Sequence, residues 1–192
     1  MAGKNIGILS LQGNYQMHSN MLSDLGAKNL FVKTKEDLFK CKALVIPGGE
    51  STVISKMMLR YDLFDSIKDF SKRNSVFGTC AGLILMANNN LNNIKTLNII
   101  DIDVLRNAWG RQINSFTENI NLNIGTAKAF RATFIRAPRI KKINNATDVL
   151  AEINKEPIMI KQGRHLATTF HPEMHGDTSI HKYFLNMINE SK

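Results

Sequence analysis

Cysteine is scarce in this 192-residue sequence, which contains only Cys41 and Cys80. Two cysteines without metal-ligand spacing exclude a disulfide framework and a cysteine-based metal site. Long hydrophobic runs are also lacking, because no apolar stretch approaches the roughly twenty residues of a membrane span. The N-terminal segment has no signal-peptide layout, since its apolar part is short and ends at Gln12-Gly13. We therefore expect a cytoplasmic protein that contacts no membrane and whose thiols stay reduced.

Acidic residues are outnumbered, with 16 Asp and Glu against 25 Lys and Arg and a net charge of +9. Such a charge raises nucleic acid as a partner. The lysines are scattered, however, and the densest basic group, residues 136–142, is short and has no interleaved aromatic side chains to stack bases. We expect no nucleic-acid partner, and an acidic protein partner explains the charge at least as well.

Linkers rich in proline, glycine or serine are absent, as are internal repeats, so we expect a single domain over residues 1–192. Strand-like and helix-like segments alternate in the first half, which predicts a doubly wound, mostly parallel sheet with helices on both faces. The expected strands are 6–11, 30–32, 43–46 and 76–77. The expected helices are 14–25, closed by Gly26, then 34–39 with Thr34 as cap, 52–59, 63–72 and a helix that follows Cys80 and runs to about Ala87.

The second half has a different pattern. The asparagine-rich residues 88–93 indicate a surface loop, and 101–105 and 133–136 indicate short strands. Three segments, 149–153, 157–161 and 165–170, are typical of consecutive antiparallel strands, and a helix is expected over 179–188. The sequence thus predicts an antiparallel region added to the parallel sheet.

Residues 75–85, S-V-F-G-T-C-A-G-L-I-L, contain the central feature of the chain. Gly78 and Gly82 lie two residues before and after Cys80, as in a sharp strand-to-helix turn that carries a nucleophile. Glycines at these places remove Cβ atoms that would clash as the chain reverses. A cysteine at a helix N-terminus is also favoured as a thiolate by the helix dipole.

A thiol nucleophile needs a base and a group that orients the base. Of five histidines, His171 ends an apolar strand and precedes Pro172 and Glu173. Proline disfavours helix at the preceding residue, and residues two apart in extended chain face the same side, so Glu173 can reach the imidazole. His18 and His181 are expected on helices and receive no role, and Cys41 is interpreted as a small buried residue.

Residues 47–52, P-G-G-E-S-T, allow two interpretations. Backbone N–H groups of the glycine pair could form an oxyanion hole, with Glu50 binding a ligand amine. The segment could also be an ordinary turn in which Ser51 or Thr52 caps a helix. A phosphate loop is disfavoured because no G-K-[ST] follows. This segment, Gln12-Gly13 and Cys80 all follow predicted strands, so they can converge at one edge of the sheet.

In order along the chain, P-G-G-E-S-T at 47–52, G-T-C-A-G at 78–82 and F-H-P-E at 170–173 resemble class I, or triad, glutamine amidotransferases. More narrowly, the chain resembles the glutaminase subunits of pyridoxal 5'-phosphate synthase. That resemblance rests on L-Q-G at 11–13, R-N-A-W-G-R-Q at 106–112, S-F at 115–116 and F-I-R-A-P at 134–138. The G-E-S-T and F-I-R-A-P segments argue against the related glutaminase subunit of imidazole glycerol phosphate synthase.

The resemblance implies a three-layer, flavodoxin-like fold. It implies that Cys80 is the nucleophile, His171 the general base and acid, and Glu173 the residue that orients His171. It places L-glutamine binding on Gly49, Glu50, Ser51, Arg106, Ile135 and Arg136, and the oxyanion hole on the N–H groups of Gly49 and Ala81. The partner it implies is a (β/α)8-barrel synthase subunit that receives ammonia, and no cofactor or metal is expected.

Two further alternatives belong to other functional classes. One is a non-catalytic regulatory subunit with an idle triad, and the other is a hydrolase of different specificity, such as a cysteine peptidase. The complete set of Cys80, His171 and Glu173 argues against the first alternative. Glu50 together with Arg106 argues against the second.

Overall fold

A seven-stranded sheet forms the centre of the computed structural model, which describes residues 5–88, 94–106 and 115–190. The strands lie in the order β2-β1-β3-β4-β11-β10-β9. The first five of these run parallel, and β10 and β9 continue the sheet antiparallel to their neighbours. The strand bounds are β1 Asn5–Leu9, β2 Asn29–Val32, β3 Cys41–Ile46, β4 Ser75–Thr79, β9 Thr147–Ile153, β10 Glu156–Gln162 and β11 His165–Thr168.

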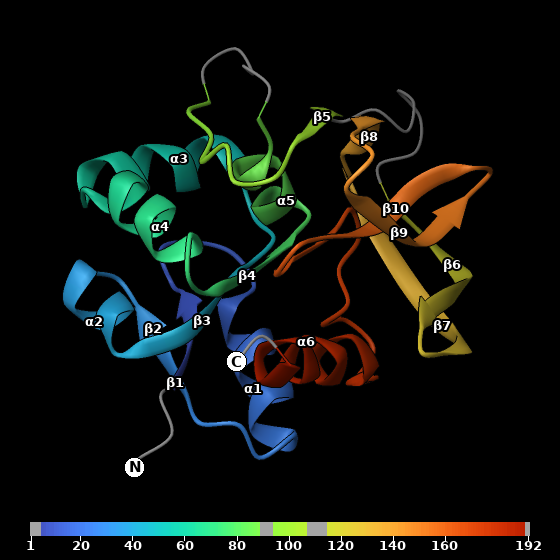
Figure 1. The fold of residues 1–192 in the computed structure, drawn as a ribbon, viewed down its shortest axis with the longest axis horizontal. Helices are drawn as coiled ribbons and strands as arrows, with labels where there is room; N and C mark the ends of the chain where they lie inside the picture. Colours follow the sequence, from blue (N-terminus) through green and yellow to red (C-terminus); the bar gives the residue numbers. More distant parts are fainter. Residues whose placement is uncertain (1–4, 89–93, 107–114, 191–192) are drawn as a thin grey trace.

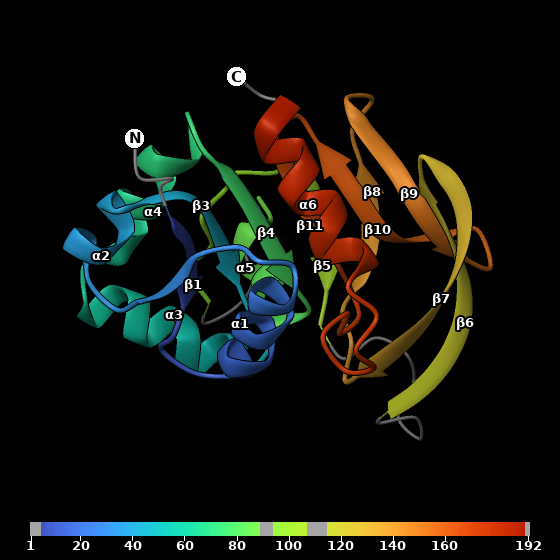
Figure 2. The ribbon, with the colours of Figure 1, turned by 90° about the horizontal axis from the view of Figure 1, so that it is seen from below.

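Helices cover both faces of this sheet, as Figures 1 and 2 show. Side chains of α1 and α6 pack on one face, and side chains of α2, α3, α4 and α5 pack on the other. The helix bounds are α1 Tyr15–Asp24, α2 Lys35–Phe39, α3 Ser51–Arg60, α4 Leu63–Ser71, α5 Ala81–Met86 and α6 Ser179–Glu190. The prediction of a three-layer, mostly parallel α/β fold is therefore confirmed.

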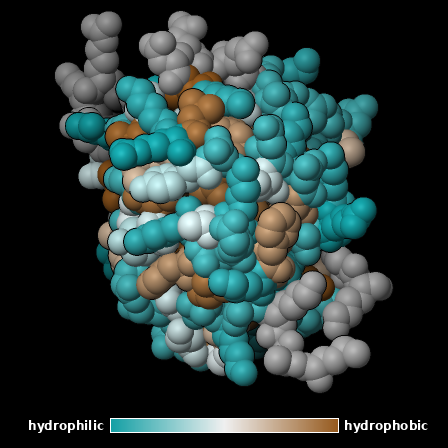
Figure 3. All heavy atoms as spheres, turned by 90° about the vertical axis from the view of Figure 1, so that its left-hand side faces the viewer, coloured by the Kyte–Doolittle hydropathy of each residue, from teal (hydrophilic) through white to brown (hydrophobic). Residues whose placement is uncertain are grey.

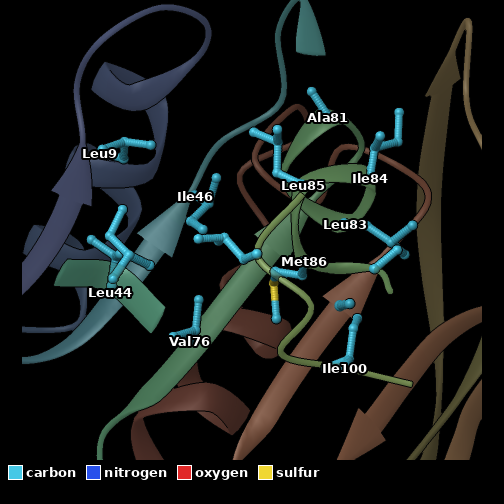
Figure 4. Packing of buried hydrophobic residues seen from close by; sticks show 14 of the residues in the cluster. Leu9, Leu44, Ile46, Val76, Ala81, Leu83, Ile84, Leu85, Met86 and Ile100 are labelled. Atoms are coloured by element: carbon cyan, nitrogen blue, oxygen red, sulfur yellow. The ribbon is translucent and has the colours of Figure 1, made fainter. Parts of the chain in front are cut away.

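Each central strand is apolar on both sides because both faces are covered. In β3, Leu44 and Ile46 point into the core under α3, α4 and α5, whereas Ala43 and Val45 point into the core under α1 and α6. Figure 4 shows Leu44, Ile46 and Val76 with the side chains of α5. Burial of each large aliphatic side chain contributes about 1.5–3 kcal/mol, so the strand ends that carry the candidate site are firmly supported.

Two smaller antiparallel pairs lie beside the central sheet. One pairs β5 (Ile102–Leu105) with β8 (Arg139–Ile143), and the other pairs β6 (Ser115–Ile124) with β7 (Thr126–Ile135). The antiparallel addition was predicted, and residues 101–105 and 133–136 were assigned to strands, but β6 and β8 were not. In β6, Ile120 and Leu122 are buried while the asparagines between and around them are exposed. Asparagine is depleted in strands, which concealed this alternating pattern.

Several expected helix ends have the predicted chemistry. Thr34 caps α2 in a complete capping box with Asp37, and Gly26 after α1 has φ of 71°. Residues 89–93 of the predicted asparagine loop lie outside the described residues.

The outer surface of the helical layers is mainly polar. On the face in Figure 3, hydrophilic side chains predominate and apolar residues occur in separate patches. No helix among the described residues is long and apolar enough to cross a membrane.

His165 makes folding stability depend on pH. Burial lowers the pKa of its imidazole from 6.5 to about 4, and its Nδ1 accepts a hydrogen bond from the Val76 N–H at 3.2 Å. Because the folded-state pKa lies below the unfolded value, the unfolded chain binds the proton first as pH falls. We expect the free energy of unfolding to fall from pH 6.5 to about 4, with this histidine contributing at most about 1.4 kcal/mol per pH unit.

Chemical denaturation of wild type and His165→Gln across this range measures the effect. The variant should have the shallower pH dependence, since glutamine takes up no proton. Identical slopes for the two proteins would contradict the assignment.

Candidate active site

Four neighbouring strands carry the candidate site at their carboxyl ends. β1, β3, β4 and β11 are adjacent in the sheet and lead into Gln12-Gly13, Pro47, Cys80 and His171 respectively. Backbone contacts hold two of these loops together, since the Asn14 N–H donates to the Gly48 carbonyl at 3.0 Å. The convergence predicted from the strand ends is therefore present in the structure.

Cys80 lies at the turn between β4 and α5, in the strained backbone conformation of φ 48° and ψ −100°. Its backbone N–H donates to the Thr168 carbonyl at 2.8 Å, which ties the turn to β11. A Cβ at Gly82 would lie 2.0 Å from the Ile46 carbonyl oxygen, and a Cβ at Gly78 would lie 2.7 Å from the Gly82 carbonyl carbon. Both glycines are required by close packing, and the turn presents the Cys80 thiol to the cavity described below.

His171 and Glu173 lie directly after β11. The His171 backbone N–H donates to the Thr133 carbonyl of β7 at 2.9 Å, which fixes the position of the imidazole. His171 Nδ1 lies 2.8 Å from Glu173 Oε1, and the Asn14 side-chain amide donates to the same oxygen at 3.1 Å. Glu173 is buried behind the imidazole, so it can orient His171 without contacting a molecule in the cavity.

The electrostatics of this pair match that arrangement. Burial by itself lowers the pKa of His171, but its hydrogen bonds with Cys80 and Glu173 raise that pKa above its ordinary value. Burial by itself raises the pKa of Glu173, whereas His18 and the hydrogen bond with His171 bring it down to about 2. Glu173 is therefore ionised at neutral pH and stabilises a protonated His171.

A cavity of about 280 Å³ opens above Cys80. Its walls include all the residues predicted for nucleophile, base, glutamine binding and oxyanion hole, namely Cys80, His171, Gly49, Glu50, Ser51, Arg106, Ile135, Arg136 and Ala81. Asn14 and Ile84 complete the lining. Within the described ranges, no group of three His, Cys, Asp or Glu side chains is suited to a metal ion.

Glu50 and two arginines give the cavity groups of both charges. Glu50 is held by its backbone N–H, which donates to Gln12 Oε1 at 2.8 Å, and by Thr52 Oγ1, which donates to its carboxylate at 2.6 Å. That hydrogen bond from Thr52, with the charges of Arg106 and Arg136, lowers the pKa of Glu50. Arg106 Nη2 lies 3.4 Å from Glu50 Oε1. The cavity can thus bind an ammonium group and a carboxylate of one small molecule.

Three polar residues near the triad had no role in the sequence analysis. Asn14 and His18 lie one helical turn apart at the start of α1, and His181 lies in α6. His18 and His181 are fully buried, and His18 Nε2 lies 3.4 Å from Glu173 Oε2. Asn14 directly after Gln12-Gly13 was a usable signal, but the approach of α1 to α6 is a tertiary contact that local sequence does not reveal.

Comparisons with known proteins identify the family to which this chain belongs. The model of the SNO glutamine amidotransferase family matches residues 8–190. The pyridoxal 5'-phosphate synthase subunit PdxT of Oenococcus oeni is 44% identical over 97% of this chain and 98% of its own length. The PdxT subunit of Fervidobacterium nodosum is 43% identical over 96% of this chain and 97% of its own length.

Solved structures show the same fold. A crystal structure of a glutamine amidotransferase has a TM-score of 0.91 and 37% identity, covering 97% of this chain and 100% of that one. PurLQS from Thermotoga maritima, with a TM-score of 0.71 and 15% identity over 97% of this chain and 99% of that one, shares the fold alone. Because the family model matches nearly the whole length of this chain, the chain belongs to the SNO glutamine amidotransferase family.

Proposed function

We propose that this chain hydrolyses L-glutamine to L-glutamate and ammonia and delivers the ammonia to a synthase subunit that makes pyridoxal 5'-phosphate. One observation carries the proposal. The Cys80 and His171 pair opens into the same cavity as Glu50, Arg106 and Arg136. A nucleophile with a base is thus placed beside charged groups that suit a free amino acid.

The charges indicate how glutamine lies in the cavity. The Glu50 carboxylate binds the α-ammonium group, and the fork of Arg106 binds the α-carboxylate. With the amino-acid end held there, the side-chain carboxamide is directed toward Cys80. Gly49 and Ala81 line the cavity, and Ala81 is the first residue of α5, so its N–H has no partner within the helix. These two N–H groups form the proposed oxyanion hole.

The first half-reaction forms a thioester. The Cys80 thiolate attacks the carboxamide carbon, a sulfur–carbon bond forms, and the carbonyl becomes an oxyanion held by the two N–H groups. Protonated His171 gives its proton to the amide nitrogen. The carbon–nitrogen bond then breaks, releasing ammonia and leaving a γ-glutamyl group on Cys80.

The second half-reaction restores the enzyme. His171 takes a proton from water, the resulting hydroxide attacks the thioester carbonyl, and a second oxyanion forms. Collapse of this oxyanion breaks the sulfur–carbon bond and releases glutamate. Glu173 stabilises the imidazolium at each stage in which His171 carries the proton.

The proposed function requires a second, synthase subunit that receives the ammonia directly. The named relatives are subunits of pyridoxal 5'-phosphate synthase, and we propose that this chain, as a single domain, docks on a (β/α)8-barrel synthase subunit. Docking is expected at the edge that carries Gln12-Gly13, where Gln12 accepts the hydrogen bond from the Glu50 N–H. The positive net charge favours an acidic docking surface on the partner.

An ammonia-release assay on the chain, with and without the synthase subunit, tests this function. Glutamine, asparagine and glutamine-containing peptides serve as substrates. We expect ammonia from glutamine, with a higher rate in the complex, and little from asparagine, whose shorter side chain leaves the carboxamide short of Cys80. Cleavage of peptides without hydrolysis of glutamine would contradict the proposal and favour a peptidase.

Gly48 sets the space available to His171. A Cβ at this residue would lie 2.3 Å from His171 Cε1 and 2.9 Å from its Nδ1. Gly48→Ala should therefore displace the imidazole and lower kcat for glutamine by about a hundredfold. Steady-state kinetics measures this loss. Gly26→Ala is a control for kcat alone, because no atom lies within 4 Å of its added Cβ and its φ of 71° affects only stability. A wild-type kcat in Gly48→Ala would disprove the packing described.

A further inference from the structure

One carboxylate oxygen of Glu173 takes no part in the triad. Oε1 is near His171 Nδ1 at 2.8 Å and Asn14 Nδ2 at 3.1 Å. Oε2 is buried and makes no hydrogen bond within standard geometry to any described residue. The ring nitrogen His18 Nε2 lies 3.4 Å from Oε2. A buried carboxylate oxygen is stable only if a donor faces it, so the proton position on His18 decides whether Glu173 is well held.

His18 is enclosed on both sides of its ring. Its Nδ1 lies 2.9 Å from His181 Nε2, and its Nε2 lies 3.2 Å from Thr79 Oγ1 as well as near Glu173. The contact joins α1 to α6, which lie on the same side of the sheet in Figures 1 and 2. Burial lowers the pKa of both histidines, that of His181 to about 3, so each ring is neutral and carries one proton.

One of the two possible tautomers leaves two groups poorly placed. If His18 carries its proton on Nδ1, it donates to His181 Nε2, and His181 must carry its own proton on Nδ1. His181 Nδ1 has no hydrogen-bond partner among the described residues, so this would be a buried unsatisfied donor. The Thr79 hydroxyl would then donate to His18 Nε2 at 3.2 Å, and Glu173 Oε2 would have no N–H beside it.

The other tautomer leaves His181 Nδ1 as a buried acceptor rather than a buried donor and places an N–H beside Glu173 Oε2. His181 Nε2–H donates to His18 Nδ1, and His18 Nε2–H donates to Thr79 Oγ1 at 3.2 Å, with Glu173 Oε2 3.4 Å from the same nitrogen. We propose that His18, held in this tautomer by His181, is a positioning residue whose Nε2–H dipole stabilises the Glu173 carboxylate and thereby orients His171. This inference rests on the proposed catalytic role of Glu173 and extends the triad to α1 and α6.

The proposal predicts where the loss of His18 acts. His18 does not line the cavity, so glutamine binding should be unaffected and the loss should be in kcat. Besides His18, the ionisable groups around Glu173 are His171 on its own loop and His181 of α6, with Cys80 beyond His171. Removing this N–H from beside the carboxylate lets Glu173 stabilise protonated His171 more strongly, which raises the His171 pKa. Hydrolysis of the thioester needs neutral His171, so the acid limb of the kcat profile should move to higher pH.

Two amide substitutions separate the two ring nitrogens. The amide nitrogen of His18→Gln can occupy the position of Nε2 near Glu173, whereas that of His18→Asn is limited to the position of Nδ1. In the complex with the synthase subunit, His18→Asn and His18→Leu should lower kcat for glutamine about 10- to 100-fold with KM unchanged. His18→Gln should retain most of the kcat, and His165→Gln, far from the site, should match wild type.

Comparison of His18→Gln with His18→Asn remains decisive if His18→Leu fails to fold. Equal kcat values in these two variants, a loss confined to KM, or an unmoved acid limb in His18→Asn would overturn the proposal. Nitrogen-15 NMR of the full wild-type chain provides a test independent of turnover. We expect the His18 proton on Nε2, and a proton on Nδ1 would overturn the inference. If the wild-type complex released no ammonia from glutamine, the proposed function would fail. The tautomer of His18 observed by NMR would still decide whether His18 presents an N–H to Glu173.

Discussion

Replacing Cys80 with alanine should reduce ammonia release from glutamine to background, a loss of about four orders of magnitude or more. Without the thiol no thioester can form, and water alone must attack an amide. Alanine fits the site, since it is smaller than cysteine and adds no branching at the positive φ of 48°. The cavity residues Glu50 and Arg106 are unchanged, so glutamine should still bind. Calorimetry on the variant, beside the ammonia assay, separates loss of chemistry from loss of binding.

Cys41→Ala is the matched control for this experiment. Cys41 is the second buried thiol, and burial with the nearby Asp37 carboxylate raises its pKa to about 11. Its Sγ donates to the Asp37 carbonyl at 3.3 Å, remote from the cavity lining. Cys41→Ala should therefore retain activity. Substantial ammonia release by Cys80→Ala, or its loss in Cys41→Ala at unchanged stability, would contradict the assignment of the nucleophile.

Gly82→Ala should have the largest effect on stability, about 3 kcal/mol or more. The added Cβ would lie 2.0 Å from the Ile46 carbonyl oxygen, and that contact is with backbone. Ile46 belongs to β3, which pairs with β1 on one side and β4 on the other. The strand cannot retreat without disturbing both pairings, so α5 and Cys80 must move instead. Thermal and chemical denaturation measure the loss, and glutaminase activity should fall with it.

Gly163→Ala distinguishes a steric cost from a conformational one. Gly163 has φ of 57°, and no atom lies within 4 Å of an added Cβ. Its replacement should cost only about 1–2 kcal/mol, the penalty of a left-handed backbone. If Gly82→Ala were no less stable than Gly163→Ala, the tight contact between the elbow and β3 would be disproved.

Local patterns accounted for the parts of the fold that depend on local chemistry. The spacing of Gly78, Cys80 and Gly82 predicted the sharp turn between β4 and α5. Backbone atoms lie so close to both glycines that neither residue could carry a Cβ. Thr34 predicted the start of α2 because a capping box needs only a few neighbouring residues. His171 and Glu173 could be paired because they are two residues apart in extended chain.

Other parts required tertiary structure or family resemblance. Arg106 and Ile135 were assigned only by resemblance, since nothing local marks them as lining the cavity near Cys80. His18 and His181 are 163 positions apart, and their contact arises because α1 and α6 cover the same face of the sheet. β8 was treated only as part of a basic group, because its pairing with β5 is not visible in the short segment R-I-K-K-I.

Trapping of the reaction intermediate tests the central claim, hydrolysis through a γ-glutamyl thioester on Cys80. The complex is quenched with acid during turnover of glutamine, and its peptides are analysed by mass spectrometry. A parallel reaction contains hydroxylamine, which converts a thioester to the hydroxamate. We predict one γ-glutamyl group on the peptide that contains Cys80, none on the peptide that contains Cys41, and γ-glutamyl hydroxamate in the parallel reaction. An adduct on another side chain, or full ammonia release without hydroxamate, would contradict the mechanism.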